Sequence, residues 1–252
     1  MGKSIDLNCD LGEWRTPDGV ALDEAIMPYI SSCNIACGGH IGDEESIRKT
    51  IKLALKYNVA IGAHPAYPDK ENFGRVVMDI KPKALTKSLE SQIVAFKMLV
   101  EDLGGELHHI KPHGALYNYA AINEETAEII VSVIKSIDPN TLVYLPGNSI
   151  SAKVAKKSGL KVVDEVFADR VYENDLSLRS RKLKGALLQK ESEVIAQLRS
   201  LVLNESVVTY QGVLKLISAQ TVCLHSDTPG AIKMAKTIHE FLTKHGVEIT
   251  TV

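Results

Sequence analysis

The chain has 252 residues, of which 45% are hydrophobic and 24% are charged, a balance typical of a globular protein with a large core. Its formal net charge of −2 leaves no basic excess, so neither nucleic acid nor an anionic membrane is expected as a main partner. No apolar stretch approaches the ~20 residues of a membrane helix, and no signal-peptide core is present, so we expect a cytoplasmic protein. Because no linker or break in composition is found, residues 1–252 are expected to form a single domain.

Apolar segments with strand character alternate with amphipathic helical segments along the chain. Strands are expected near residues 4–9, 33–37, 59–63, 107–111, 141–145, 161–167 and 221–225. Between them, apolar residues recur at helical spacing, in segments that begin with a capping side chain or end at glycine or asparagine. These helices are expected over residues 43–58, 85–103, 123–137, 151–158 and 189–203, with a last helix capped by Thr228-Pro229.

This alternation predicts parallel strands joined by right-handed crossovers. We therefore expect an α/β fold, a closed or nearly closed seven-stranded TIM-like (β/α) barrel, with an open doubly wound sheet as the second alternative. Residues 172–189 are polar and lack clear periodicity, so they are expected to form a long loop over the strand ends. The basic side chains of this loop are expected to form a solvated face. Residues 205–216 have no clear assignment.

The cysteines lie inside apolar strands or at their ends, which is typical of buried thiols in a reducing compartment. They are Cys9, Cys33, Cys37 and Cys223. Their spacing does not match a zinc site. A catalytic thiolate at Cys9 or Cys37 is the weaker interpretation, and small core residues are the favoured one.

The segment His109–Tyr117 carries the clearest signal for a functional site. Its polar residues His109, Lys111 and His113 are spaced by two, so on a strand all three point to one face. A strand that only builds a core would present Val, Ile or Leu there, because buried polar groups cost free energy unless they are paired. Two imidazoles and an ammonium at a strand end therefore indicate function.

Other strand ends repeat this pattern of an apolar run followed by polar side chains and a turn. In parallel α/β folds, ligands bind at the carboxyl ends of the strands. The polar residues at these ends are Asp6, Asn8, Asp10, Glu13, Asn34, His40, His64, Asp169, Arg170 and Asp227. A single one of them is most simply a satisfied polar residue, but the whole set predicts a catalytic or binding site.

These residue types favour direct acid–base chemistry. Asp10, Glu13, Asp169 and Asp227 are candidate acids or bases, since carboxylates crowded into one cleft have their pKa values pushed apart. Lys111 beside them can bind an anionic group or stabilise an oxyanion.

A metal site is the alternative chemistry. His40, His64 and His113 can bind a metal together with Asp10, because barrels place such ligands on different strands. Direct acid–base work is favoured over metal, because no His-x-x-Glu-His or similar spacing occurs. The sequence also contains no G-x-G-x-x-G, and Gly2-Lys3-Ser4 lacks the rest of a phosphate loop, so the chain has no nucleotide-binding motif of its own.

Several of these segments together resemble the LamB/YcsF family. The resemblance extends over nearly the whole chain and rests on Asp6–Glu13 (DLNCDLGE), Asn34–Gly39 (NIACGG) with His40, Gly62–Pro65 (GAHP), Phe73–Arg75, Lys111–Asn118 (KPHGALYN), Glu165–Arg170 (EVFADR) and Cys223–Asp227. The sequence departs from the family pattern at Ser226, where Gly is usual. It departs again at Ser177–Arg179, where a Leu-Val-Pro-Arg pattern is usual, which bears on specificity near the loop.

This resemblance implies a barrel of the glycoside hydrolase/deacetylase type and the A subunit of an ATP-dependent 5-oxoprolinase. That enzyme opens 5-oxo-L-proline to L-glutamate while ATP is hydrolysed. The resemblance also implies partner subunits B and C, with ATP shared with or supplied by them.

Under this resemblance, we expect Asp10 or Asp227 to act as general base, and Lys111 and His113 to steady the developing charge. Arg170 is expected to pair with the substrate carboxylate in bidentate fashion. The other expected substrate-binding residues are Asn8, Glu13, Asn34, His40, His64 and Asp169.

Two alternatives belong to other functional classes. One is a stand-alone metal-dependent deacetylase or amidohydrolase, with Asp10, His40 and His64 as candidate metal ligands. The other is a non-catalytic subunit that only binds the lactam or a partner. Bound metal with ATP-free hydrolysis would distinguish the first, and loss of binding without effect on any chemical step would distinguish the second.

Overall fold

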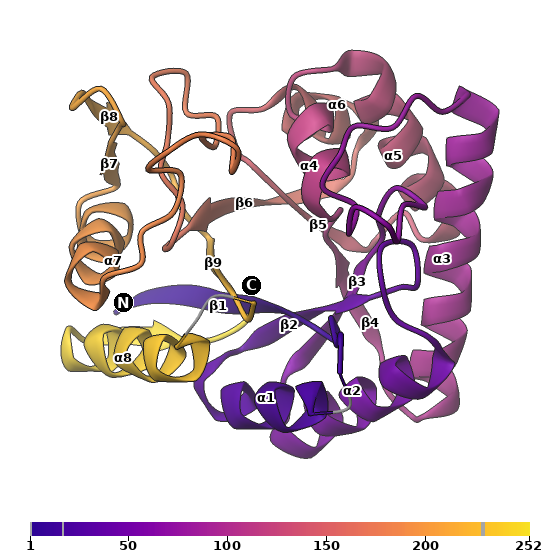
Figure 1. Cartoon of the computed structure of the whole chain (residues 1–252), viewed down its shortest axis with the longest axis horizontal. Helices are drawn as coiled ribbons and strands as arrows, with labels where there is room; N and C mark the ends of the chain where they lie inside the picture. The colour runs from indigo at the N-terminus through magenta and orange to yellow at the C-terminus, as the bar shows by residue number, and fades with distance from the viewer. Residues whose placement is uncertain (1, 17, 228–229) are drawn as a thin grey trace.

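The computed structural model describes residues 2–16, 18–227 and 230–252. Parallel strands form a closed barrel, with helices around its outside (Figure 1). The barrel strands are β1 (Lys3–Leu11), β2 (Ser32–Ala36), β3 (Ala60–His64), β4 (Leu107–Ile110), β5 (Leu142–Leu145), β6 (Lys161–Phe167) and β9 (Thr221–His225). Strand β1 pairs with β2 on one side and with β9 on the other, which closes the barrel. The expected seven-stranded TIM-like barrel is therefore confirmed, and the open sheet is wrong.

The helices lie between the strands in the expected order. They are α1 (Gly19–Ile26), α2 (Glu44–Tyr57), α3 (Pro82–Asp102), α4 (Gly114–Ala120), α5 (Glu124–Ile137), α6 (Ile150–Ser158), α7 (Glu191–Leu198) and α8 (Ala231–Lys244), with a 3₁₀ turn at Met27–Tyr29 and a π-helical turn at Arg199–Leu203. Asp43, Asn123 and Ser149 cap α2, α5 and α6, because each side chain accepts a bond from a backbone N–H of the first turn. The cap expected at Thr228-Pro229 lies outside the described residues. Across the described ranges, no helix is long and apolar enough to span a bilayer.

Five elements were not anticipated. Helices α1 and α4 are short, and the segment over residues 205–216 forms an antiparallel hairpin of β7 (Ser206–Val208) and β8 (Leu214–Leu216). Strand β10 (Val247–Ile249) pairs with the beginning of β1 outside the closed ring. Such short elements carry too few residues to show a period in the sequence.

The interior of the barrel is polar at its β1 wall. Leu7 and Cys9 point outward to the helices, whereas Asp6, Asn8 and Asp10 alternate inward, and all are buried. The Asp6 carboxylate accepts hydrogen bonds from three hydroxyls, those of Ser31, Ser32 and Thr221. The two-residue period of β1 therefore delivers a ladder of hydrogen-bonded polar groups that leads to the carboxyl end of the barrel.

The segment over residues 172–189 runs across this carboxyl end as expected for a loop (Figure 1). Bridges Arg170↔Leu187 and Tyr172↔Leu178 fold it back on itself. The Arg179 guanidinium lies 3.4 Å from the ring centroid of Tyr210, which ties the segment to the β7–β8 hairpin. All four cysteines are buried and free, as expected.

Candidate active site

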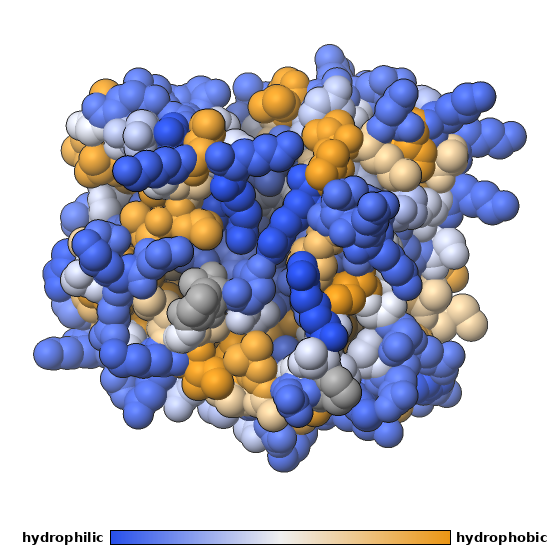
Figure 2. Space-filling model, in the orientation of Figure 1, coloured by the Kyte–Doolittle hydropathy of each residue, from blue (hydrophilic) through white to orange (hydrophobic). Residues whose placement is uncertain are grey.

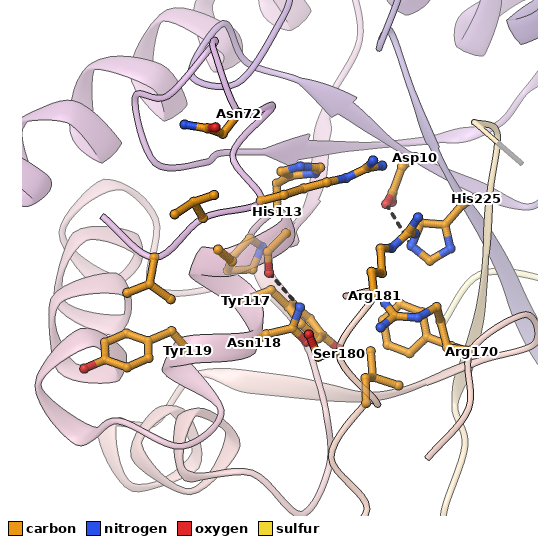
Figure 3. Close-up of a pocket in the computed structure, with 18 of the residues that line it drawn as sticks. Asp10, Asn72, His113, Tyr117, Asn118, Tyr119, Arg170, Ser180, Arg181 and His225 are labelled. Atoms are coloured by element: carbon orange, nitrogen blue, oxygen red, sulfur yellow. Dashed lines mark hydrogen bonds and ion pairs between the residues drawn. The ribbon is translucent and has the colours of Figure 1, made fainter. Parts of the chain in front are cut away.

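A pocket of about 520 Å³ opens at the carboxyl ends of the barrel strands. Asp10 and His225 lie side by side at the ends of the paired strands β1 and β9, with His225 Nε2 4.0 Å from Asp10 Oδ2, and Arg181 reaches toward them from the long loop (Figure 3). Hydrophilic side chains gather over the middle of the face that Figure 2 presents. The ionisable residues among its lining are Asp10, Glu13, His64, Arg75, Lys111, His113, Tyr117, Tyr119, Arg170, Arg181, Lys182 and His225.

The buried ammonium of Lys111 lies at the floor of the pocket among four acceptors. Its Nζ is 2.9 Å from Asp10 Oδ1 and 2.8 Å from Glu165 Oε1. It is also 3.2 Å from Asn8 Oδ1 and 3.0 Å from Cys223 Sγ. Burial opposes the charge of Lys111, but Asp10 and Glu165 outweigh it and hold its pKa well above the usual value. The ammonium stays charged and its three donors are occupied within the protein.

Asn34 and His109 orient Asp10 from below. Asn34 Nδ2 donates to Asp10 Oδ1 at 2.8 Å and to Asn8 Oδ1 at 2.7 Å. The amide oxygen of Asn34 lies 2.7 Å from His109 Nε2, and the His109 ring stacks on Tyr144 with centroids 3.9 Å apart. Because Lys111 and Asn34 both bind Oδ1, the other carboxylate oxygen of Asp10 is left for the pocket.

Backbone carbonyls fix the tautomers of two histidines at the pocket wall. His64 Nδ1 donates to the carbonyl of Lys111 at 2.7 Å, and His113 Nε2 donates to the carbonyl of Phe73 at 3.0 Å. In their neutral forms, His64 Nε2 and His113 Nδ1 therefore carry lone pairs. These two nitrogens are only 3.0 Å apart.

Carboxylate oxygens adjoin both lone pairs. His64 Nε2 lies 3.3 Å from Asp10 Oδ2, and His113 Nδ1 lies 3.2 Å from Glu13 Oε1. Acceptor atoms this close repel one another unless a proton or another cation lies between them. Imidazole nitrogens and carboxylate oxygens also suit a divalent metal, and backbone bonds to the far ring nitrogen are typical of metal-bound histidines. The residues therefore fit a metal ion as well as a shared proton.

The turn after β1 positions Glu13 against a second pair of imidazoles. Buried Asp23 accepts a bond from Trp14 Nε1 at 2.6 Å, which holds the turn in place. Glu13 Oε1 then lies 2.8 Å from His40 Nε2, and the His40 ring stacks on His113 with centroids 3.7 Å apart. His40 Nδ1 is buried and has no hydrogen-bond partner among the described residues.

Burial and neighbouring charges set the protonation of the cluster. Burial favours protonated Asp10 and Glu13, but the histidines beside them, and Lys111 in the case of Asp10, outweigh it and lower both pKa values. Burial lowers the pKa of His113, and burial with the neighbouring His113 lowers the pKa of His40 to about 4. At neutral pH the carboxylates are therefore ionised, and these two imidazoles are neutral.

Arginines occupy the mouth of the pocket. Arg75 forms an ion pair with Asp227, and Arg181 Nη1 lies 4.0 Å from the same carboxylate. Arg170 is buried, and its Nη2 donates to the carbonyl of Arg179 at 2.8 Å. Within the described ranges its buried Nε has no acceptor, although Arg170 lines the pocket.

The structure gathers most of the sequence-predicted residues at this pocket. Six line it: Asp10, Glu13, His64, Lys111, His113 and Arg170. Asn8, Asn34 and His40 lie behind these residues and contact them. Asp169 adjoins the pocket through His225, whose Nδ1 lies 2.9 Å from the Asp169 carboxylate. Asp227 lies on the rim in its ion pair with Arg75.

Sequence reasoning missed four functional candidates: Glu165, His225, Arg75 and Arg181. Glu165 and His225 had a usable signal, because each lies two residues from another side chain that faces the barrel interior, Phe167 and Cys223 respectively. The arginines lie on loops with no such period, and the basic loop residues were interpreted as a solvated face. Arg181 and Lys182 keep contact with solvent, but they also line the pocket.

The sequence pattern of the LamB/YcsF family matches residues 5–252. The chain belongs to the LamB/YcsF family. The resemblance inferred from the motifs is thereby confirmed. Among relatives of this LamB/YcsF chain, the A subunit of 5-oxoprolinase from Shouchella clausii is 44% identical, with 98% of this chain and 97% of the relative covered. The protein of the same name from Bacillus cytotoxicus is 41% identical over 97% of both chains.

A solved structure has the same fold. The lactam utilization protein of Thermus thermophilus superimposes with a TM-score of 0.90 at 33% identity. The superposition covers 99% of this chain and 100% of that protein, so the two share the whole barrel.

Proposed function

We propose that this chain is the A subunit of an ATP-dependent 5-oxoprolinase, which converts 5-oxo-L-proline, ATP and two waters to L-glutamate, ADP and phosphate. Relatives named as the A subunit of 5-oxoprolinase match this chain over almost their full length, which supports the proposal. The buried carboxylates, imidazoles and lysine at the strand ends supply the acid–base groups that the opening of an amide requires. Partner subunits B and C complete the enzyme, and the reaction belongs to the cytoplasm, where ATP is available.

The chemical problem is that a lactam carbon is a poor electrophile. Transfer of the ATP γ-phosphoryl group to the lactam oxygen releases ADP and makes the ring carbon open to attack. One water then forms a C–O bond at that carbon, and the C–N bond breaks as the nitrogen gains a proton, which gives an acyl phosphate. A second water attacks the same carbon, and the C–O bond to phosphate breaks. Glutamate and phosphate leave, and two waters have been consumed.

Asp10 is the proposed general base for the attacking water. It lines the pocket, it is ionised, and its Oδ2 is not engaged by Lys111 or Asn34. His64 Nε2 lies 3.3 Å from Asp10 Oδ2 and passes the proton on to Nδ1 of the neutral His113, 3.0 Å away. Of the two carboxylates considered as base, Asp10 is better placed than Asp227, whose charge is paired with Arg75 at the rim.

Lys111 is a positioning residue in this scheme. Its donors are occupied by protein acceptors, so it acts by keeping Asp10 ionised and aimed at the water. The guanidinium of Arg170, which lines the pocket, is the proposed contact for the substrate carboxylate, because a guanidinium donates to a carboxylate in fixed geometry. The substrate then lies between Arg170 and Asp10.

The test is glutamate release from 5-oxoproline by the chain alone and with subunits B and C, each with and without ATP. Release only in the full mixture with ATP is the expected result. If no mixture releases glutamate, the proposal is overturned. If His113→Ala leaves the rate of the full mixture unchanged, the proposed role of His113 is overturned. If substitutions in the cluster abolish lactam binding but never slow a chemical step, the chain is a lactam-binding subunit instead.

The converging acceptor atoms favour one second candidate, a metal-dependent amidohydrolase that acts without ATP. Asp10, His64 and His113 would hold the ion, since their atoms lie within 4.8 Å of one another. A bound divalent metal polarises an amide carbonyl and lowers the pKa of water. Metal found in the purified chain by elemental analysis, together with lactam hydrolysis in the absence of ATP, would support this candidate.

A further inference from the structure

A second cavity of about 340 Å³ adjoins the active-site pocket. It lies at the carboxyl ends of β5 and β6, between the turn over residues 146–149 and the long loop. The two cavities share one wall, formed by Asn118, Ile122, Phe167 and Leu178. Nothing in the proposed lactam chemistry uses this cavity, and a small lactam does not need its volume.

The charges of the two cavities differ sharply. Arg75, Arg181 and Lys182 line the mouth of the first cavity. Around the second cavity, the described lining contains no lysine or arginine and includes the carboxylates Asp164, Glu165 and Asp175. A polyanion is therefore attracted to the first cavity and repelled from the second.

The lining of the second cavity suits a nucleoside. Phe167, Tyr172 and Leu176 offer aromatic and apolar surface against which a base can pack. Asn148 and the carboxylates offer acceptors for ring amino groups and sugar hydroxyls. One oxygen of Glu165 is buried, and no donor reaches it in the described part of the chain.

Successive residues of the long loop line first the second cavity and then the first. Residues 175–178 line the second cavity, and Leu178, Ser180, Arg181 and Lys182 line the first. A ligand that lies along this loop therefore passes from apolar and acidic surroundings to basic ones within a few residues.

We propose that the two adjoining cavities bind one nucleoside triphosphate, with the triphosphate against Arg75, Arg181 and Lys182 and the nucleoside in the second cavity. This deepens the proposed function and rests on it, because it places the phosphoryl donor beside the lactam. Asp227 then acts as an internal substitute for the phosphate. It pairs with Arg75 and lies 4.0 Å from Arg181, so the triphosphate must displace it.

The test separates the two halves of the ligand. Binding of a non-hydrolysable ATP analogue, inorganic tripolyphosphate and adenosine is measured by calorimetry, on the purified chain and on the chain with its partner subunits. Ser218→Trp fills the second cavity from an exposed lining position. Leu216→Trp is the matched control, because Leu216 is 80% exposed and lies outside both linings. Arg181→Gln weakens the phosphate side.

Ser218→Trp is expected to weaken binding of the ATP analogue by about tenfold or more, equivalent to about 1.4 kcal/mol, and to leave the affinity for tripolyphosphate unchanged. Arg181→Gln is expected to weaken binding of both the analogue and tripolyphosphate. Leu216→Trp is expected to change neither affinity. Equal effects of the two tryptophans, or an analogue that binds no more tightly than tripolyphosphate or does not bind at all, would overturn the inference. If the assembled enzyme still releases glutamate with ATP in that case, the proposed function stands and a partner holds the nucleotide. Analogue binding as predicted without any ATP-dependent release would instead overturn the proposed function.

Discussion

Replacement of Asp10 by asparagine separates its chemistry from its place in the fold. The amide oxygen of the variant can still accept from Lys111 and Asn34, which now lie 2.9 Å and 2.8 Å from Asp10 Oδ1. Its NH₂ can donate to the lone pair of His64 Nε2, 3.3 Å from Oδ2. Lys111 keeps Glu165 as a charged partner at 2.8 Å. The variant is therefore expected to fold, with a change in unfolding free energy of about 1 kcal/mol.

What Asp10→Asn loses is the base. Removal of a positioned general base slows a reaction by about 10²–10⁴-fold, which corresponds to about 3–5 kcal/mol of the activation barrier. The assay is steady-state glutamate release by the chain assembled with its partner subunits, with ATP and saturating 5-oxoproline, and we expect kcat to fall while KM for the lactam changes little.

Asp6→Asn is the matched control, because Asp6 lies on the same face of β1 but outside the pocket and binds only hydroxyls in the described structure. It is expected to lose stability rather than kcat. A rate for Asp10→Asn within about threefold of the wild-type rate would refute the assignment of the base.

Three further predictions concern the surroundings of the site. In Gly62→Ala the new Cβ clashes sterically with the buried His109 ring, so the free energy of unfolding should fall by about 1–3 kcal/mol. An unchanged midpoint of urea unfolding would contradict this. Burial raises the pKa of Asp23 from 3.8 to about 6, so its contribution to native stability falls by about 3 kcal/mol as the pH rises from about 4 to about 6. Between pH 4 and 7, the unfolding free energy of Asp23→Asn relative to the wild type should therefore rise by that amount in denaturant titrations. A difference between the two proteins that does not change with pH would contradict this. Dialysis of the chain against a chelator, followed by assay with its partner subunits and Mg-ATP, should leave glutamate release unchanged. Lactam hydrolysis without ATP that is lost on dialysis and restored by a divalent metal would favour the metal-dependent hydrolase.

The barrel was predictable because its signals are local and repeated. Apolar runs of strand length alternate with helical stripes, and the side-chain caps at Asp43 and Asn123 mark where helices begin. The inward face of β1 was equally legible, because Asp6, Asn8 and Asp10 keep a period of two through a buried strand. These elements could be predicted because the signals that define them lie within short stretches of sequence and do not depend on long-range contacts.

The partners within the site were less accessible to sequence reasoning. The pairing of Lys111 with Glu165 depends on how β4 and β6 face each other across the closed barrel, which no local pattern records. Arg181 reaches the pocket only because the long loop folds back over it. Ser226, at a position where the family usually has Gly, donates its hydroxyl to the carbonyl of Asp10 at 2.7 Å, a contact visible only in the folded chain.

The most direct test of the proposed chemistry follows the lactam oxygen. 5-Oxoproline carrying ¹⁸O in the ring carbonyl is converted by the assembled enzyme with ATP, and the phosphate and glutamate are analysed by mass spectrometry. Activation by phosphorylation of the lactam oxygen predicts that the label leaves in inorganic phosphate. Label retained in glutamate, with unlabelled phosphate, would contradict the central claim that the oxygen is phosphorylated and leaves with the phosphate.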